Sequence, residues 1–489
     1  MKKLLTTIYL VLFALTATAQ DTTILNKMRR IERESSQVER YSYLLLDLAG
    51  SRLAGSDGAE RGYKIAREAM AAMGLSNARV EFARRWHRGG FDIEKSYAAM
   101  SVPYYQPFFP AIVGWTGGTE GLRRGEVIVI DDVDSTTFAN KYRGKLEGKI
   151  VLMPSRATYA MNFSTPSATR ISDENLEKLA AAPTPEPTAM QRRNRPPQQR
   201  LIDWVRAENP LAVVNCSGDF NNPGVTFFNH QQGDKPIAPE FNLAVESYGL
   251  MKRLVENGER VVMELDFKTR FTGNRPINNV VAEIEGTDLK DELVIIGGHI
   301  DSYHLSPGAG DDAAGCIVMM EAMRLLKEAG VKPRRTIRIV LWGGEEMGLH
   351  GSAGYVEQFV GRRDAPLKEH SKISCYINSD YGPGKFRGIY TQANEAAYPI
   401  FATWLAPFKN DGCSTVSNLS VGSTDHISFD IAGIPAFQFI SDNLEWGRAS
   451  HRVTDFADRM IYADTKHNAL VVAWLAYCAA MSDEKMPRK

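Results

Sequence analysis

With 489 residues, the chain is longer than one ordinary hydrophobic core supports, and we expect more than one domain. Its 58 lysines and arginines balance 58 aspartates and glutamates, which gives a formal net charge of zero. This balance argues against a protein that binds nucleic acid or an anionic membrane through bulk charge. We therefore expect neither nucleic acid nor a membrane as a partner.

The N-terminus, MKKLLTTIYLVLFALTATAQ, has the layout of a secretory signal peptide. Two lysines precede an apolar stretch, and the small-residue motif ATA ends at Ala19. The apolar stretch is too short for a transmembrane anchor, and no later segment is long and apolar enough. We predict that residues 1–19 are removed and that the mature protein is secreted or periplasmic.

Residues 20–101 predict amphipathic helices around a Gly-rich turn. Short β-like runs follow, and we expect an inserted β-rich domain over residues 102–267. Its Pro-rich polar stretch near 181–200 predicts a mobile surface loop. From residue 268 to 489, apolar strands alternate with helices, which indicates an α/β sheet covered by helices on both faces. Residues 20–101 and 268–489 are therefore predicted to form one α/β domain.

Histidines and acids follow the predicted strands of this sheet. Ligands of such sheets bind outside the carboxyl ends of the strands. The strand ELVIIGGHID ends in His299 and Asp301, and Asp311 and Asp312 stand at the start of the next helix. The strand RTIRIVLWGG is followed by the paired glutamates, SKISCYINSD ends in an acid, and SHRVTD supplies another histidine; these residues are Glu345, Glu346, Asp380 and His451.

So many acids at one rim need a counter-charge. Taken alone, each motif has an ordinary explanation as a helix cap, a solvated acid pair or a surface histidine. Taken together, three carboxylates, two neutral imidazoles and one hydroxide balance the charge of two Zn²⁺ ions. Imidazole with carboxylate and no thiolate suits catalytic zinc. We predict two zinc ions per chain, with the ligands His299, Asp311, Glu346, Asp380 and His451.

The motifs H-x-D-S, G-A-x-D-D, W-x-x-E-E-x-G-L-x-G-S, N-x-D and H-x-x-x-D resemble the di-zinc exopeptidase family. That family includes the secreted bacterial leucyl aminopeptidases and the plasma glutamate carboxypeptidases. The segment SRLAGS and the β-rich insert look most like the latter branch, whose insert is a protease-associated domain. The resemblance implies a zinc-exopeptidase fold of the phosphorylase/hydrolase-like type, with a mixed sheet.

The resemblance also implies roles for the residues. Asp311 would bridge the two metals, His299 and Asp380 would complete one site, and Glu346 and His451 the other. Glu345 would be the general base that activates a hydroxide bridging the two zinc ions. Asp301 would hold His299 in orientation, and by analogy Asp455 would hold His451. The expected activity is hydrolysis of a peptide or dipeptide near a chain terminus by a secreted metallo-exopeptidase.

Two other functions fit parts of the pattern. A glutaminyl-peptide cyclotransferase-like enzyme uses a similar fold with one zinc, and a non-enzymatic binding protein can retain the same fold. If the chain is an exopeptidase, the sequence leaves open whether it has aminopeptidase specificity or carboxypeptidase/dipeptidase specificity. The insert has two expected roles, which are narrowing the cleft and forming a homodimer.

Overall fold

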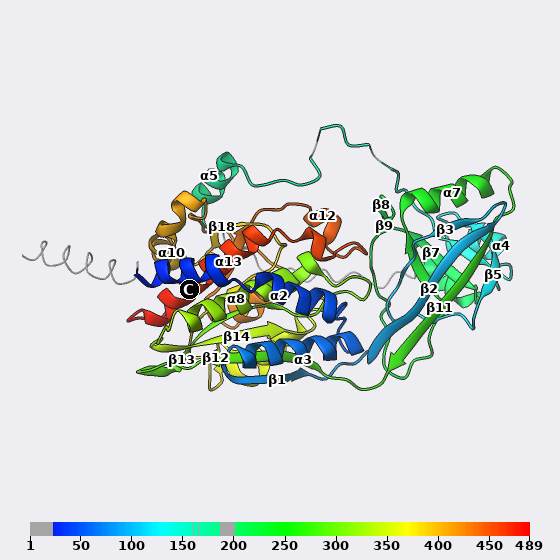
Figure 1. The fold of residues 1–489 in the computed structure, drawn as a ribbon. Helices are drawn as coiled ribbons and strands as arrows, with labels where there is room; N and C mark the ends of the chain where they lie inside the picture. Colours follow the sequence, from blue (N-terminus) through cyan, green and yellow to red (C-terminus); the bar gives the residue numbers. More distant parts are fainter. Residues whose placement is uncertain (1–22, 160, 165, 186–200) are drawn as a thin grey trace, which may run out of the picture.

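The computed structural model describes residues 23–489, apart from 160, 165 and 186–200 (Figure 1). The predicted signal peptide and most of the predicted Pro-rich loop lie outside these described residues. Over the described ranges, none of the helices has the length and apolar character to cross a bilayer. None of the five cysteines, all of which lie within the described residues, forms a disulfide.

The first sheet has eight strands in the order β1-β12-β14-β13-β17-β20-β18-β19. Its central strands β14, β13, β17 and β20 are mutually parallel, whereas β1, β12 and β18 pair antiparallel to their inner neighbours. The predicted mixed α/β sheet is thus confirmed. The strands are β1 (Ser76–Arg84), β12 (Ile277–Ile284), β13 (Leu289–His299), β14 (Arg335–Trp342), β17 (Ile373–Asn378), β18 (Phe386–Tyr390), β19 (Thr415–Ser417) and β20 (Ala436–Ser441).

Helices cover both faces of this sheet. Its central strands are therefore buried on both sides, and their sequences are continuous apolar runs. Val294 and Ile296 of β13 belong to one core, and Ile295 between them belongs to the core on the other face. The helices of the first core are α2 (Val38–Ser42), α3 (Asp57–Ala72), α8 (Ala314–Glu328), α10 (Tyr398–Leu405) and α13 (Tyr462–Met481), and those of the second are α9 (His350–Tyr355) and α11 (His426–Ile431).

A second eight-stranded sheet stands beside the first at one end of the molecule (Figure 1). Its two longest strands, β2 and β11, pair with each other and cross both boundaries predicted for the insert, at 102 and 267. Helices α4 (Ser135–Lys141) and α6 (Leu201–Ala207) pack on one face and α7 (Val245–Glu256) on the other. The strands are β2 (Gly90–Val102), β3 (Gln106–Phe108), β4 (Ala111–Ile112), β5 (Arg123–Val129), β6 (Ile150–Leu152), β7 (Ala212–Cys216), β10 (Glu240–Leu243) and β11 (Val262–Thr272).

One helix between the strands of the second sheet does not lie on that sheet. Helix α5 (Asp173–Ala181) lies over the first sheet near β18, at the end of a long connection (Figure 1). The division into domains and the identification of the insert as a protease-associated domain stay predictions. Other short elements include the ribbons β8 (Gly218–Asp219) with β9 (Asn222–Pro223) and β15 (Gly361–Arg362) with β16 (Ala365–Pro366), and helix α12 (Trp446–Ala449).

Candidate metal centre

The predicted site residues meet at the carboxyl edge of the first sheet. His299 is the last residue of β13, the paired glutamates follow β14, and Asp380 follows β17. Asp311 lies in the kinked segment 309–313 before α8, where its own φ and ψ are not helical, and His451 follows α12. Because β13, β14 and β17 are parallel neighbours, residues far apart in the chain come together at this edge.

A glycine turn lets both glutamates face the site. Strand β14 ends at Trp342, and Gly344 has a φ of +69°, a conformation that glycine adopts without strain. The Asp301 carboxylate then holds the turn through two hydrogen bonds from its backbone. Its Oδ1 accepts a hydrogen bond from the Glu345 backbone N–H at 3.0 Å, and its Oδ2 accepts one from the Glu346 N–H at 3.3 Å. Asp301 therefore positions the backbone of the paired acids.

The orientation predicted for His299 also involves Asp301. The His299 Nδ1 lies 3.1 Å from the Asp301 backbone oxygen and 3.6 Å from its Oδ1. With Nδ1 donating to that oxygen, Nε2 points into the cluster with a free lone pair. This is the tautomer that a metal ligand requires.

Asp311 lies between the two imidazoles. Its Oδ1 is 3.3 Å from the Nε2 of His299, and its Oδ2 is 3.4 Å from the Nε2 of His451. Ser450 Oγ donates a hydrogen bond of 2.7 Å to Oδ2. One carboxylate with an imidazole on each side is the arrangement expected of a ligand shared by two cations.

Each imidazole has a further carboxylate nearby. The Nε2 of His451 is 3.0 Å from Glu346 Oε2, and the Nε2 of His299 is 3.9 Å from Asp380 Oδ2. Glu345 Oε2 lies 4.0 Å from the His299 Nε2, on the same side of the cluster. The five predicted ligands thus divide into two groups that share Asp311.

The cluster fits a divalent metal. Glu346 Oε1 is buried with no hydrogen-bond partner, although buried carboxylate oxygens are normally satisfied. Ligand atoms of His299, Asp311 and Glu346 all lie within 4.8 Å of one another. Burial raises the pKa of the Glu345 and Glu346 carboxyls well above the usual value. A cation among these groups removes that penalty, and imidazole with carboxylate is a donor set that zinc accepts.

Asp312 is a second possible partner of His299 and Asp380, since ligand atoms of these three also lie within 4.8 Å of one another. Its carboxylate is already bound to the backbone. Oδ2 accepts from the His299 N–H at 3.3 Å, and Oδ1 accepts from the Gly315 N–H at 3.0 Å. We therefore assign Asp312 to the support of the loop and Asp311 to the centre of the cluster.

Asp455, which we expected beside His451, takes a different position. Its Oδ1 accepts a hydrogen bond from the Gly310 N–H at 2.8 Å, and its Oδ2 accepts one from the Asp311 N–H at 3.1 Å. Asp455 therefore holds the loop that presents Asp311, and it does so from a segment far downstream in the chain. A spacing of four residues from His451 gave no indication of this.

The comparisons with known proteins match the same part of the chain. Residues 279–476, which contain the whole cluster, match the sequence model of Peptidase family M28. This segment is a Peptidase family M28 domain. The resemblance to the metal-dependent exopeptidases is thereby confirmed, and the chain is a metallopeptidase.

Relatives cover nearly the whole chain. Carboxypeptidase Q from Bos taurus is 27% identical over 456 residues, which covers 91% of this chain and 85% of the relative. The crystal structure of a Peptidase M28 precursor from Shewanella amazonensis superposes with a TM-score of 0.70 at 20% identity, over 96% of this chain and 99% of that one. A zinc aminopeptidase from Bacillus subtilis gives a TM-score of 0.57 at 19% identity, over 92% and 95%. The two structures share the fold of this M28 peptidase.

A cavity of about 430 Å³ opens onto the cluster. Sequence reasoning missed several side chains that line it. Tyr303 packs against His451 with ring centroids 4.4 Å apart, and Tyr381 and Ser450 directly follow or precede predicted ligands. Neighbouring position in the chain was the one available signal for the last two. The full lining is Tyr303, Asp311, Glu345, Glu346, Gly348, Leu349, Asp380, Tyr381, Ser423, Trp446, Ser450 and His451.

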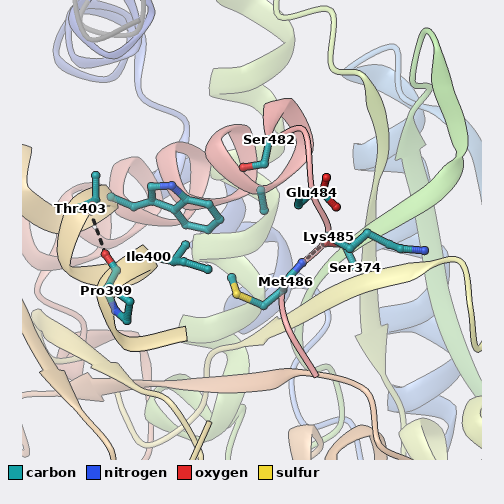
Figure 2. A pocket seen from close by; sticks show the side chains of 10 residues that line it. Ser374, Pro399, Ile400, Thr403, Ser482, Glu484, Lys485 and Met486 are labelled. Carbon is teal, nitrogen blue, oxygen red and sulfur yellow. Dashed lines mark hydrogen bonds between the residues drawn. The ribbon is translucent and has the colours of Figure 1, made fainter. Parts of the chain in front are cut away.

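Another cavity, of about 380 Å³, lies between α10, the end of α13 and the C-terminal residues (Figure 2). Ile400, Trp404 and Met486 make much of its wall apolar, and it shares no lining residue with the cavity at the cluster. Of its lining residues, Glu484 alone carries a carboxylate. This second cavity therefore offers no comparable set of metal ligands.

Proposed function

We propose that this M28 peptidase is a secreted di-zinc exopeptidase that hydrolyses the terminal peptide bond of peptides and dipeptides. The observation that carries the proposal is the position of Asp311, whose two oxygens face the Nε2 atoms of His299 and His451. Export is supported by the sequence pattern of residues 1–19, which is typical of a signal peptide.

In this proposal Asp311 is the ligand that the two zinc ions share. His299 and Asp380 complete one site, and Glu346 and His451 complete the other. The unpartnered Glu346 Oε1 and the donor set of imidazoles and carboxylates support zinc at these positions. When bound, the zinc ions lower the pKa of a water molecule and polarise the scissile carbonyl.

Glu345 is proposed as the general base. Its carboxylate lines the cavity and is largely buried, and Asp301 accepts a hydrogen bond only from its backbone N–H. A carboxylate held in this way can take a proton from the attacking water and return it to the leaving amine. The Asp301 hydrogen bonds keep it in reach of the substrate while the proton moves.

The cavity favours a substrate with a free amino terminus. Among the described residues, no arginine or lysine lines it, whereas four carboxylates do. A free substrate carboxylate is usually recognised by arginine or backbone donors, and a free ammonium by a carboxylate. We therefore propose aminopeptidase-type cleavage, because the described cavity lining offers no arginine or lysine to pair with a substrate carboxylate and its acidic side chains favour an ammonium group.

Chelation and end-blocked dipeptides test the proposed function together. EDTA treatment is expected to abolish hydrolysis of Ala-Ala, and added Zn²⁺ is expected to restore it, because the bound zinc is what activates the attacking water. A C-amidated dipeptide should be cleaved and its N-acetylated counterpart should not. Activity that persists after chelation would contradict the metal-dependent mechanism, and cleavage of the N-acetylated substrate alone would show carboxypeptidase-type recognition.

A further inference from the structure

A segment of the second sheet's chain reaches across to the first sheet. The chain leaves the second sheet after β6, at residue 152, and returns to it with α6, which begins at Leu201. Between them, residues 169–181, which we call the strap, lie on the first sheet's side of the molecule, with α5 near β18 (Figure 1). In the chain the strap therefore lies between elements of the second sheet, but in space it lies against the first sheet.

The strap is held there by specific bonds. Thr169 and Leu444 form a backbone pair, with hydrogen bonds of 2.8 and 3.3 Å. The fully buried carboxylate of Asp442 accepts a hydrogen bond from the Ile171 N–H at 2.9 Å and one from Arg170 at 2.7 Å. Charge-assisted bonds to a buried acid fix a segment more firmly than surface ion pairs do. The position of the strap is thus defined.

The strap forms one wall of a pocket of about 550 Å³. Its contribution comes from Ile171, two residues before α5, and from one side of the helix. The opposite wall comes from the first sheet and the loops at its edge. The strap residues are Ile171, Asn175, Lys178 and Leu179, and the opposite wall is Tyr381, Tyr390, Val421, Phe439, Ser441, Asn443 and Trp446.

This pocket adjoins the cavity at the proposed metal centre. Tyr381 and Trp446 line both, and their rings meet edge to face with centroids 6.3 Å apart. Tyr381 directly follows the proposed ligand Asp380 in the chain. A substrate with its scissile bond at the metal centre therefore has room for a side chain on the far side of this aromatic pair.

The chemistry of the walls indicates what the pocket accepts. Aromatic and aliphatic side chains make up most of the lining, and apart from Lys178 its polar members are neutral. Its cation, Lys178, is exposed and already paired with Glu174 at 2.6 Å. Apolar walls with few charges select large uncharged side chains through the surface that they bury.

We propose that the strap forms one wall of a substrate side-chain subsite and gives this peptidase a preference for a large apolar side chain beside the scissile bond. The inference rests on the proposed exopeptidase function. Leu179, on the exposed helix α5, is then a specificity-determining residue, although it lies outside both the matched M28 segment and the metal cluster.

The test compares kcat/KM for Phe-Ala, Leu-Ala, Ala-Phe and Ala-Ala in the zinc-loaded full chain. The wild-type protein is expected to cleave its best large-residue substrate about tenfold or more faster than Ala-Ala. Leu179→Asp should reduce that ratio about tenfold while Ala-Ala hydrolysis changes less than about twofold. Leu179→Phe, which narrows the pocket, should lower kcat/KM for the Phe substrates more than for Leu-Ala. Glu177→Ala, an exposed position on the same helix that does not line the pocket, is the matched control and should leave the ratio unchanged.

An unchanged ratio in Leu179→Asp, or an equal loss on every substrate, would overturn the inference and leave the proposed function intact. Failure of the zinc-loaded wild-type protein to cleave any of the four dipeptides would instead overturn the proposed function. Ala-Ala separates the two failures, because its small side chains make little use of the pocket.

Discussion

The Glu345→Gln variant is expected to keep its zinc and to lose about 10²–10⁴-fold in kcat, the usual contribution of general acid–base catalysis. Glutamine preserves the shape of the side chain and the backbone hydrogen bond to Asp301, but it cannot accept a proton. Steady-state kinetics on Ala-Ala, with metal content measured on the same preparation, checks this outcome.

The adjacent Glu346→Gln variant is the matched control for Glu345→Gln. Glu346 contacts His451 at 3.0 Å and is proposed as a ligand, so its replacement should weaken zinc binding together with activity. If Glu345→Gln retained near wild-type kcat, or if it lost zinc while Glu346→Gln kept it, the roles of the two glutamates would have to be exchanged or abandoned.

The Asp311→Asn variant is expected to lose both zinc ions and to fall below about one-hundredth of wild-type activity, since even residues that only support metal ligands contribute 10–100-fold. The reason is geometric. Asp311 is the carboxylate that lies between the two imidazoles, so its replacement removes a ligand from both metals at once. Metal content after dialysis and kcat/KM are the measurements.

Asp312→Asn provides the comparison, because it makes the same chemical change one residue away. The Asp312 carboxylate accepts two backbone hydrogen bonds, and the single amide oxygen of asparagine cannot replace both of its oxygens as acceptors. We expect a loss of about 1–3 kcal/mol in the free energy of unfolding with zinc content preserved. Loss of zinc in Asp312→Asn and its retention in Asp311→Asn would mean that Asp312, and not Asp311, is the shared ligand.

The position of the site was predictable because it follows from sheet geometry. His299, the paired glutamates and Asp380 each stand at the end of an apolar run, and parallel neighbouring strands bring such ends to one edge. The turn at Gly343–Gly344 was also predictable from the sequence, because glycine at a strand end permits the bend that lets both glutamates face the site. Local sequence carries both kinds of information.

The contacts around the site were less predictable because they join distant segments. Asp455 binds the loop before Asp311, and Ser450 donates to the Asp311 carboxylate; neither spacing nor residue type indicates these pairs. The strap is a stronger case. Its helix stands in sequence among the strands of the second sheet, and it lies over the first because of long-range contacts such as the bond to the buried Asp442. Tertiary contacts of this kind leave no periodic pattern in the chain.

The number of zinc ions bound by each wild-type chain decides whether two cations share this rim. We expect two equivalents after zinc loading and removal of free metal, with anomalous scattering placing one beside His299 and Asp380 and the other beside Glu346 and His451. A single tightly bound zinc would favour the cyclotransferase-like alternative. No bound transition metal under any loading condition would contradict the proposal that a dication pair balances this acidic rim.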